Sequence, residues 1–324
     1  MLAMAIEDST LHPADHPTPE PGPGQVLIEV AAAGINRADL LQLQGLHPPP
    51  PGAPDHPGLE VSGTIAATGP GVTGWRVGDP VCALLDGGGY ASHALAQADY
   101  LLPIPDGVSL VDAAGLPEAM ATVWSNLIDV AGLSATDNTG RTVLVHGGSG
   151  GIGTTAIQVL RATGAVVFTT AGGPGRVERC QALGAYGIDH RSEDFVTVVR
   201  EATGERGVDV VLDVVGAAYL QRNIDALAPH GQLVVIGLQK GTTGELNLAP
   251  VLGKWISIHG TGLRRRPPAQ KAAIVSDLRE RAWPYLDRGQ VRPIIADTMP
   301  LRRAADAHRL LAAGKVFGKL LLIP

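Results

Sequence analysis

Apolar and polar residues follow two different patterns along this chain of 324 residues. Up to about residue 115, short apolar runs are separated by turns rich in proline and glycine, which is typical of a small β-rich domain. The clearest strands are expected at residues 26–33, 59–68 and 80–85, with a helical turn at 39–44. Helical periodicity begins near residue 109, where the pattern changes.

Strand and helix patterns alternate from residue 142 onward, which predicts a parallel, doubly wound α/β sheet. The tail is expected to form helices at 269–287 and 302–313 and a last strand at 319–323. We therefore expect two domains, residues 1–115 together with 265–324, and residues 116–264. The expected strands of the second domain are 142–146, 165–170, 208–214 and 232–238, and its helices are 154–163, 176–183 and 219–227.

A glycine-rich segment, Gly147–Gly153, lies between the first strand and the first helix of this alternating region. Glycines allow a tight turn and a close approach of the backbone to a pyrophosphate, and a helix N-terminus offers free N–H groups to it. The same glycine spacing recurs at 69–74, but no helix pattern follows there, and we interpret that segment as a loop. The strand, turn and helix around Gly147–Gly153 predict a dinucleotide phosphate site.

The tip of the next strand bears on the choice of dinucleotide. An NAD site usually has an acidic residue about 20 positions beyond the glycines, and here the strand is followed by Gly172 and Arg176 instead. A guanidinium pairs with a ribose 2′-phosphate, which favours NADPH. Alternatively, Arg176 is an exposed residue of the following helix. His190 could flank the adenine side.

Several longer motifs are similar to those of one family. They are GINRADL at 34–40, QGLHPPPPG at 44–52, PGLEVSG at 57–63, GGGYA at 87–91 and the glycine segment. The chain resembles the zinc-independent quinone oxidoreductase branch of the medium-chain dehydrogenase/reductase superfamily, closest to the tumour-suppressor-inducible subgroup. The resemblance implies a Rossmann domain of the α/β class and a chaperonin-10-like, partly open barrel. The N-terminus looks about one strand short of its relatives, which puts the first hairpin in doubt.

Two replacements bear on the metal. Zinc-dependent members of the superfamily have Cys and His where this chain has Asn36 and Leu59, and Zn²⁺ needs three protein ligands in a catalytic site. The chain has two cysteines, Cys82 and Cys180, too few for a four-cysteine zinc lobe. The resemblance thus implies no zinc, and hydride transfer to an acceptor that is already electrophilic.

The resemblance also implies roles for individual residues. Asn36 would lie near the nicotinamide and the substrate carbonyl, with Thr122 nearby. His47 could protonate a reduced quinone oxygen, or it is an exposed histidine of a proline-rich loop. The expected cofactor-binding residues are Gly147, Ser149, Gly150, Gly151, Ile152, Gly153, Gly172, Arg176, His190, Gly237, Leu238, Gly262 and Lys319.

These patterns predict an NADPH-dependent quinone reductase. The alternatives are a reductase of α,β-unsaturated carbonyls or enoyl thioesters, and a crystallin-like NADPH-binding protein with little catalysis. A net charge of −6 gives no support for nucleic-acid binding, and no membrane span or secretory signal is visible, so we expect a cytoplasmic protein. The resemblance implies a homodimer. The Arg264–Arg266 run is either a solvated loop or a wall near the cofactor or substrate entrance.

Overall fold

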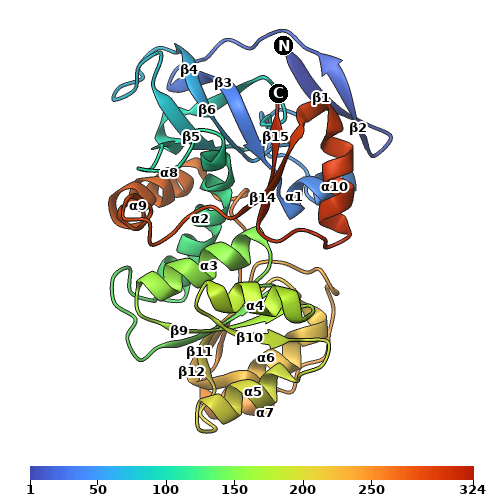
Figure 1. The fold of residues 1–324 in the computed structure, drawn as a ribbon, viewed down its shortest axis with the longest axis vertical. Coiled ribbons are helices and arrows are strands. Elements are labelled where there is room, and N and C mark those ends of the chain that lie inside the picture. Colours follow the sequence, from blue (N-terminus) through green and yellow to red (C-terminus); the bar gives the residue numbers. More distant parts are fainter. The chain divides into compact units, whose positions relative to one another are not determined.

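The computed structural model describes residues 1–324, and contacts within the chain divide it into two compact units. The first unit comprises Met1–Ala121 and Leu263–Pro324, and the second comprises Thr122–Gly262. Figure 1 labels their helices and strands.

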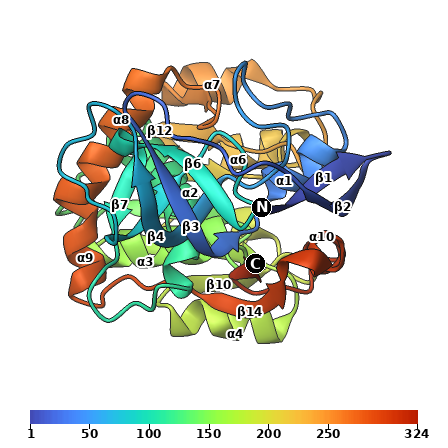
Figure 2. The same cartoon turned by 90° about the horizontal axis from the view of Figure 1, so that it is seen from above.

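The first unit is built on a seven-stranded sheet in the order β14-β15-β3-β4-β5-β7, with β6 also paired to β3. Figure 2 shows β3, β4 and β6 side by side, as their antiparallel pairing requires. The strands are β3 Gln25–Gly34, β4 Glu60–Thr68, β5 Pro80–Leu84, β6 His93–Gln97, β7 Leu101–Pro103, β14 Ile295–Pro300 and β15 Lys319–Ile323. Its helices are α1 Arg37–Leu43, α8 Pro268–Asp277, α9 Trp283–Asp287 and α10 Ala304–Ala312, together with most of α2 Pro117–Trp124.

The N-terminal hairpin, which the sequence puts in doubt, is present. Strands β1 (Leu2–Glu7) and β2 (Thr10–Asp15) pair over six residues each. The two-residue turn places Asp8 and Ser9 at φ values of 49° and 60°. This left-handed turn matches the twist of a hairpin, but it lacks the Asn-Gly or Asp-Gly sequence by which such turns are recognised.

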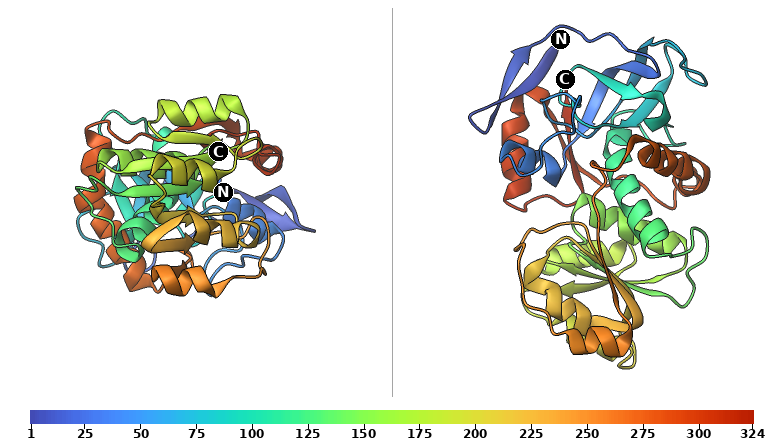
Figure 3. Two further views of the ribbon diagram at one scale, coloured as in Figure 1. Left: turned by 90° about the horizontal axis from the view of Figure 1, so that it is seen from below. Right: turned by 180° about the vertical axis from the view of Figure 1, so that it is seen from behind.

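The second unit is a six-stranded parallel sheet in the order β10-β9-β8-β11-β12-β13. Figure 1 shows α3 and α4 on one side of these strands and α5 and α7 on the other, and the view from below in Figure 3 agrees. The predicted doubly wound fold is confirmed. The strands are β8 Thr142–His146, β9 Val166–Ala171, β10 Tyr186–Asp189, β11 Val208–Asp213, β12 Leu227–Val235 and β13 Ser257–Gly260; the helices are α3 Gly151–Ala162, α4 Pro174–Ala182, α5 Phe195–Ala202, α6 Leu220–Ala226 and α7 Leu248–Lys254.

The central strands of this sheet are apolar because helices cover both of their faces. All six residues of β11 are buried, and Val143, Leu144 and Val145 of β8 are fully enclosed. Burying apolar surface stabilises the fold by roughly 25 cal/mol per Å². These enclosed strands are therefore held firmly, and their ends stay in fixed positions.

The helix expected at 269–287 is present without a gap, as α8, a π-type turn at Leu278–Ala282 and α9. Pro284 lies in the first turn of α9, directly after the π-type turn. Because proline has no N–H, it cannot donate an ordinary helical hydrogen bond there. The expected strand at 232–238 differs, because β12 begins at Leu227 and ends at Val235.

Candidate functional site

The glycine segment of the second unit forms a tight turn between β8 and α3. Gly147 has a φ of +74°, which favours glycine, and its N–H donates to Thr170 Oγ1 at 3.3 Å. Gly150 N donates back to the Gly147 carbonyl at 3.0 Å, and α3 begins at the next residue. The first turn of α3 therefore offers N–H groups that no helical carbonyl can satisfy.

Two glycines of this turn have no room for a side chain. A Cβ at Gly148 would lie 2.1 Å from Thr169 Oγ1, and one at Gly153 would lie 2.3 Å from the Gly147 carbonyl oxygen. The backbone is thus packed as closely as a dinucleotide phosphate turn requires, while Ser149–Ile152 stay partly exposed. The residues present fit the phosphates of a nicotinamide dinucleotide.

Other sequence-predicted residues of the second unit lie at the carboxyl edge of the same sheet. Gly172 follows β9, His190 follows β10, and Gly237 and Leu238 come shortly after β12. Strand order reverses at β8, which stands between β9 and β11, and ligands of doubly wound sheets bind at such a switch point. The fold brings these residues to the edge that carries the glycine turn, and Gly262 lies two residues beyond β13.

The tip of β9 gathers basic side chains. Arg176 Nη1 approaches the Gly172 carbonyl at 3.5 Å, and a Cβ at Gly172 would lie 3.1 Å from His190 Nε2 and 3.2 Å from Arg191 Nε. Asp189 accepts the N–H groups of Gly173 and Arg191, so its carboxylate is occupied by backbone. The arrangement offers two guanidinium groups where a ribose 2′-phosphate would be held.

In the first unit, the amide of Asn36 is held from both ends. Its Nδ2 donates to Glu60 Oε1 at 2.8 Å, and its Oδ1 accepts from Lys319 Nζ at 2.7 Å. Lys319 Nζ also forms an ion pair with Glu60 Oε1. Glu60 and Lys319 are 0% and 5% exposed, whereas Asn36 is partly exposed. Asn36 keeps one N–H free, with its direction fixed.

A second buried network secures the start of α1 beneath Asn36. Asp39 is 0% exposed and accepts from Asn36 N at 2.7 Å, Gly58 N at 3.1 Å and Tyr90 Oη at 3.0 Å. Tyr90 Oη also lies 3.0 Å from His308 Nε2. Burial raises the pKa of Asp39 to about 6 despite these donors. The network explains why a turn of helix begins at residue 37.

Glu118, at the first turn of α2, belongs to the same region of the first unit. Its N–H donates to Glu60 Oε2 at 2.9 Å, and its side chain is partly exposed. Burial, followed by the nearby Glu60 carboxylate, raises the pKa of Glu118 to about 8. This carboxyl therefore holds its proton at neutral pH.

The other two predicted catalytic residues have different surroundings. His47 is partly buried in the proline-rich loop, and its carbonyl accepts from Arg264 Nη1 at 2.9 Å. Burial, then Arg264 and Arg265, lower the pKa of His47, so its imidazole is neutral at pH 7. Thr122 belongs to the second unit, and its carbonyl accepts from Asn126 Nδ2 at 2.8 Å.

The side chains present do not fit a zinc ion. Asn36 offers an amide already held by Glu60 and Lys319, and Leu59 is a core side chain that is 1% exposed. No group of three or more His, Cys, Asp or Glu side chains in the chain could hold a metal ion. None of the helices combines the length and the apolar character that crossing a membrane would need.

Two family models match the chain. Residues 22–106 match the alcohol dehydrogenase GroES-like domain, and residues 151–278 match the zinc-binding dehydrogenase domain. The first match falls within the β-rich unit and the second begins at the first residue of α3.

Among curated relatives, quinone oxidoreductase from Sus scrofa is 30% identical over 313 residues, which cover 96% of this chain and 92% of the relative. The chain belongs to the quinone oxidoreductase branch of the medium-chain dehydrogenase/reductase superfamily. It is also 34% identical over 300 residues to a phenolphthiocerol/phthiocerol polyketide synthase from Mycobacterium tuberculosis. The match covers 92% of the chain but only 13% of that synthase.

Solved structures of this superfamily share the fold over the whole chain. An NAD-dependent alcohol dehydrogenase has a TM-score of 0.88 at 30% identity, covering 100% of both chains. A mycobacterial protein complexed with NADPH has a TM-score of 0.87 at 28% identity, again covering 100% of both chains. The enoyl reductase CurK has a TM-score of 0.86 at 27% identity, covering 99% of this chain and 98% of that one.

Sequence reasoning missed part of this candidate site. Glu60 lies inside a motif that carried the family resemblance, but its contact with Asn36 and Lys319 was not anticipated. Lys319, expected to bind the cofactor, has its ammonium group on Glu60 and Asn36. Glu118 gave no signal, because its raised pKa comes from burial in the folded unit and then from Glu60, 58 positions away.

Proposed function

We propose that this protein is an NADPH-dependent quinone reductase that works without a metal ion. The observation that carries the proposal is the Asn36 amide, fixed by Glu60 and Lys319 with one N–H free. That N–H can donate to an acceptor oxygen as negative charge develops on it, which stabilises the transition state of hydride transfer. When bound, NADPH supplies the hydride.

The glycine turn and the basic tip of β9 would hold the cofactor. The first turn of α3 binds the pyrophosphate through its N–H groups, and Arg176 and Arg191 pair with the 2′-phosphate. The relative solved with NADPH supports this choice, while the NAD-dependent relative shows that the fold accommodates either cofactor.

Because the acceptor is already electrophilic, no Lewis acid is needed, and the donor set around Asn36 offers none. Because the pKa of His47 is lowered, few of its imidazole groups carry a proton to donate at pH 7, so we propose that the proton comes from solvent. Thr122 remains a proposed neighbour of the nicotinamide.

A second candidate function is the reduction of an enoyl thioester or another α,β-unsaturated carbonyl. The structural similarity to the CurK enoyl reductase favours it, and so does the sequence similarity to part of a polyketide synthase. The same Asn36 N–H would then stabilise an enolate oxygen. A third candidate, crystallin-like NADPH binding with little turnover, requires only the glycine turn.

A panel of cofactors and acceptors distinguishes these functions. NADPH oxidation with a small quinone, faster than with any enone or enoyl thioester, supports the first. Turnover only with enones or enoyl thioesters supports the second, and tight NADPH binding without turnover supports the third. Activity that survives chelation, with no stoichiometric zinc in metal analysis, would support the metal-free mechanism; loss on chelation would contradict it.

A further inference from the structure

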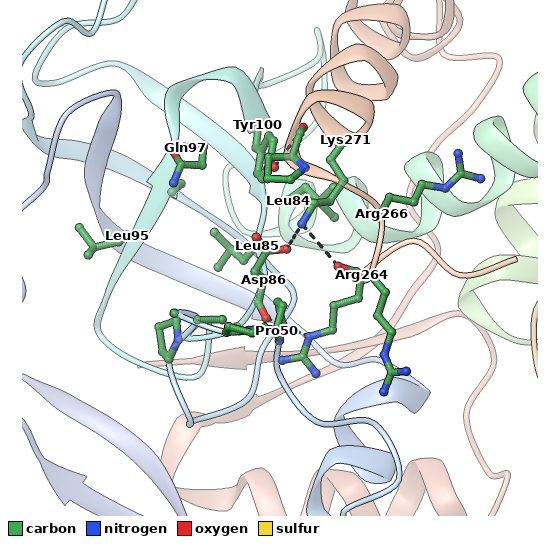
Figure 4. A pocket seen from close by; sticks show the side chains of 18 of the residues that line it. Pro50, Leu84, Leu85, Asp86, Leu95, Gln97, Tyr100, Arg264, Arg266 and Lys271 are labelled. Carbon is green, nitrogen blue, oxygen red and sulfur yellow. Dashed lines mark hydrogen bonds and ion pairs between the residues drawn. The ribbon is translucent and has the colours of Figure 1, made fainter.

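A pocket of about 550 Å³ lies in the first unit, and Asn36, Glu60 and Lys319 are not among the residues that line it. One wall is the proline-rich loop at Pro50–Pro54, and another is the start of α8 with Lys271. Figure 4 shows Leu84, Leu85 and Tyr100 around it. Its volume suits a small organic ligand, and proline and leucine side chains supply apolar surface.

Arg264 is the unusual residue of this pocket. It is only 4% exposed, yet its guanidinium has no carboxylate within ion-pair distance. Nε donates to the Asp86 carbonyl at 2.9 Å and Nη1 to the His47 carbonyl at 2.9 Å, but the buried Nη2 has no partner. A buried donor without a partner is costly, and more so when it is charged, so a ligand acceptor is the natural explanation.

The charge of the pocket is one-sided. Its lining includes Arg264, Arg265, Arg266 and Lys271 but only one carboxylate, Asp86. Figure 4 shows Asp86 engaged by the Lys271 ammonium, which also reaches the Arg264 carbonyl at 3.4 Å. Arg264 forms no direct ion pair, and the carboxylates of Asp39, Asp86 and Glu118 act on it only from a longer distance.

We propose that this pocket binds the phosphate group of an organic molecule, with Nη2 of Arg264 as its buried donor. A guanidinium suits a tetrahedral oxyanion because it presents several N–H donors in one plane. Arg265, which is exposed, adds charge at the rim. The proline and leucine surface contacts the organic part.

The phosphate could come from a free phosphorylated metabolite or from the nucleotide end of a coenzyme A thioester. The second source rests on the thioester candidate of the proposed function, and the first does not. The two are distinguished with inorganic pyrophosphate and adenosine 3′,5′-bisphosphate as probes.

Isothermal titration calorimetry on protein saturated with NADPH tests the proposal without using turnover. Pyrophosphate should bind saturably at one site and weaken as NaCl is added. Arg264→Met should weaken it at least about tenfold, the expected loss of a charge-assisted hydrogen bond. Because Arg264 is buried and its loss could disturb the loop, Arg265→Ala serves as a second variant, expected to weaken binding several-fold.

Two control variants make the result specific. Arg302→Ala removes an exposed arginine elsewhere in the unit, and His47→Ala leaves the carbonyl that Arg264 uses; both should bind pyrophosphate within about twofold of wild type. If adenosine 3′,5′-bisphosphate displaces pyrophosphate, the phosphate belongs to coenzyme A. If it does not, the phosphate belongs to a free phosphorylated metabolite. No saturable binding, release of NADPH by pyrophosphate, or unchanged affinity in both arginine variants would overturn the proposal. A failed quinone assay would leave it standing.

Discussion

At the scale of single residues, the position of Asn36 depends on a buried ion pair between strands far apart in the sequence. Glu60 opens β4 and Lys319 opens β15, and both side chains are almost completely enclosed. Two opposite charges in such a place are tolerated because each satisfies the other and both bind the same amide.

Removing one partner of this pair should destabilise the protein more than removing both. Lys319→Met leaves the Glu60 carboxylate buried and uncompensated, which we expect to lower the free energy of unfolding by about 3 kcal/mol. The double variant Glu60→Gln/Lys319→Met should lose clearly less. Urea denaturation measures both, with Lys315→Met, at an exposed position, as the control. Additive losses would show that the two side chains are not coupled.

Glu118 predicts a dependence of stability on pH. Its pKa is raised from 4.5 to about 8 in the folded protein, so the folded state binds more protons than the unfolded chain between these values. Its contribution to stability is full below pH 4.5 and is lost as the pH rises to 8. Glu118→Gln removes this titration, so relative to wild type it should gain about 1–3 kcal/mol between pH 5 and 9.

Denaturation at pH 5, 7 and 9 measures that difference. Glu201→Gln, an exposed carboxylate of α5, is the matched control and should show no such trend. A difference between Glu118→Gln and wild type that stays constant over this range would mean that Glu118 is ionised throughout.

Arg176 predicts the cofactor preference. Arg176→Ala should raise the KM for NADPH about tenfold or more, because a charge-assisted pair with the 2′-phosphate is lost, and leave the KM for NADH nearly unchanged. Arg179→Ala, one turn further along α4, is the control. Steady-state kinetics with both cofactors decides; equal effects on NADPH and NADH would exclude a role in binding the phosphate.

Whether the role of a single residue can be predicted depends on how far away in the sequence its hydrogen-bond partners lie. Asn36 was identified because its motif is contiguous in sequence. Its partners were not, since Glu60 and Lys319 lie 24 and 283 positions away and their pairing arises only in the folded sheet. Likewise, nothing local in the sequence indicates that Arg264 is buried with an unpartnered Nη2.

At the scale of elements, the turn between β8 and α3 makes the sharpest prediction. Gly153→Ala places a Cβ against the backbone of Gly147 and Gly148, which cannot yield without opening the turn. We expect NADPH affinity to fall at least tenfold, because a displacement of the binding N–H groups by even 1 Å is costly. Fluorescence titration measures it. Gly253→Ala is the control, because a Cβ at this helical glycine meets no atom within 4 Å. This variant should bind NADPH normally and gain about 0.5–1 kcal/mol of stability. Normal NADPH binding by Gly153→Ala would show that the turn is not part of the cofactor site.

The elements themselves were largely predictable where periodicity is strong. The strands β3, β8 and β15 match their expected ranges to within a residue, because buried apolar runs bounded by turns have few alternatives. The first hairpin is hard to predict from the sequence, because its turn, Asp8-Ser9, is not a common sequence for that geometry. The helix expected at 269–287 is present, but its π-type turn at Leu278–Ala282 could not be predicted from periodicity.

At the scale of the whole molecule, β13 is the edge strand of the parallel sheet, and one side of it has no partner within the chain. Large apolar side chains are exposed on it and on α7: Ile258 at 43%, Leu252 at 80% and Trp255, just after α7, at 67%. An exposed apolar edge strand is a template for pairing with another chain. The expected homodimer would pair this edge with its own copy about a two-fold axis.

Charge placed on that edge should therefore separate the two copies. The chain has a mass of 33.4 kDa, so light scattering of the wild type should give twice this value, and the variant Leu252→Glu/Ile258→Lys should give 33.4 kDa itself. The variant should still bind NADPH, since the glycine turn lies at β8, with β11 and β12 between it and this edge. Val77→Lys, which changes an apolar side chain 62% exposed in the other unit, should remain dimeric. A monomeric wild type would contradict the dimer, and a variant that remains dimeric would place its interface elsewhere than on β13.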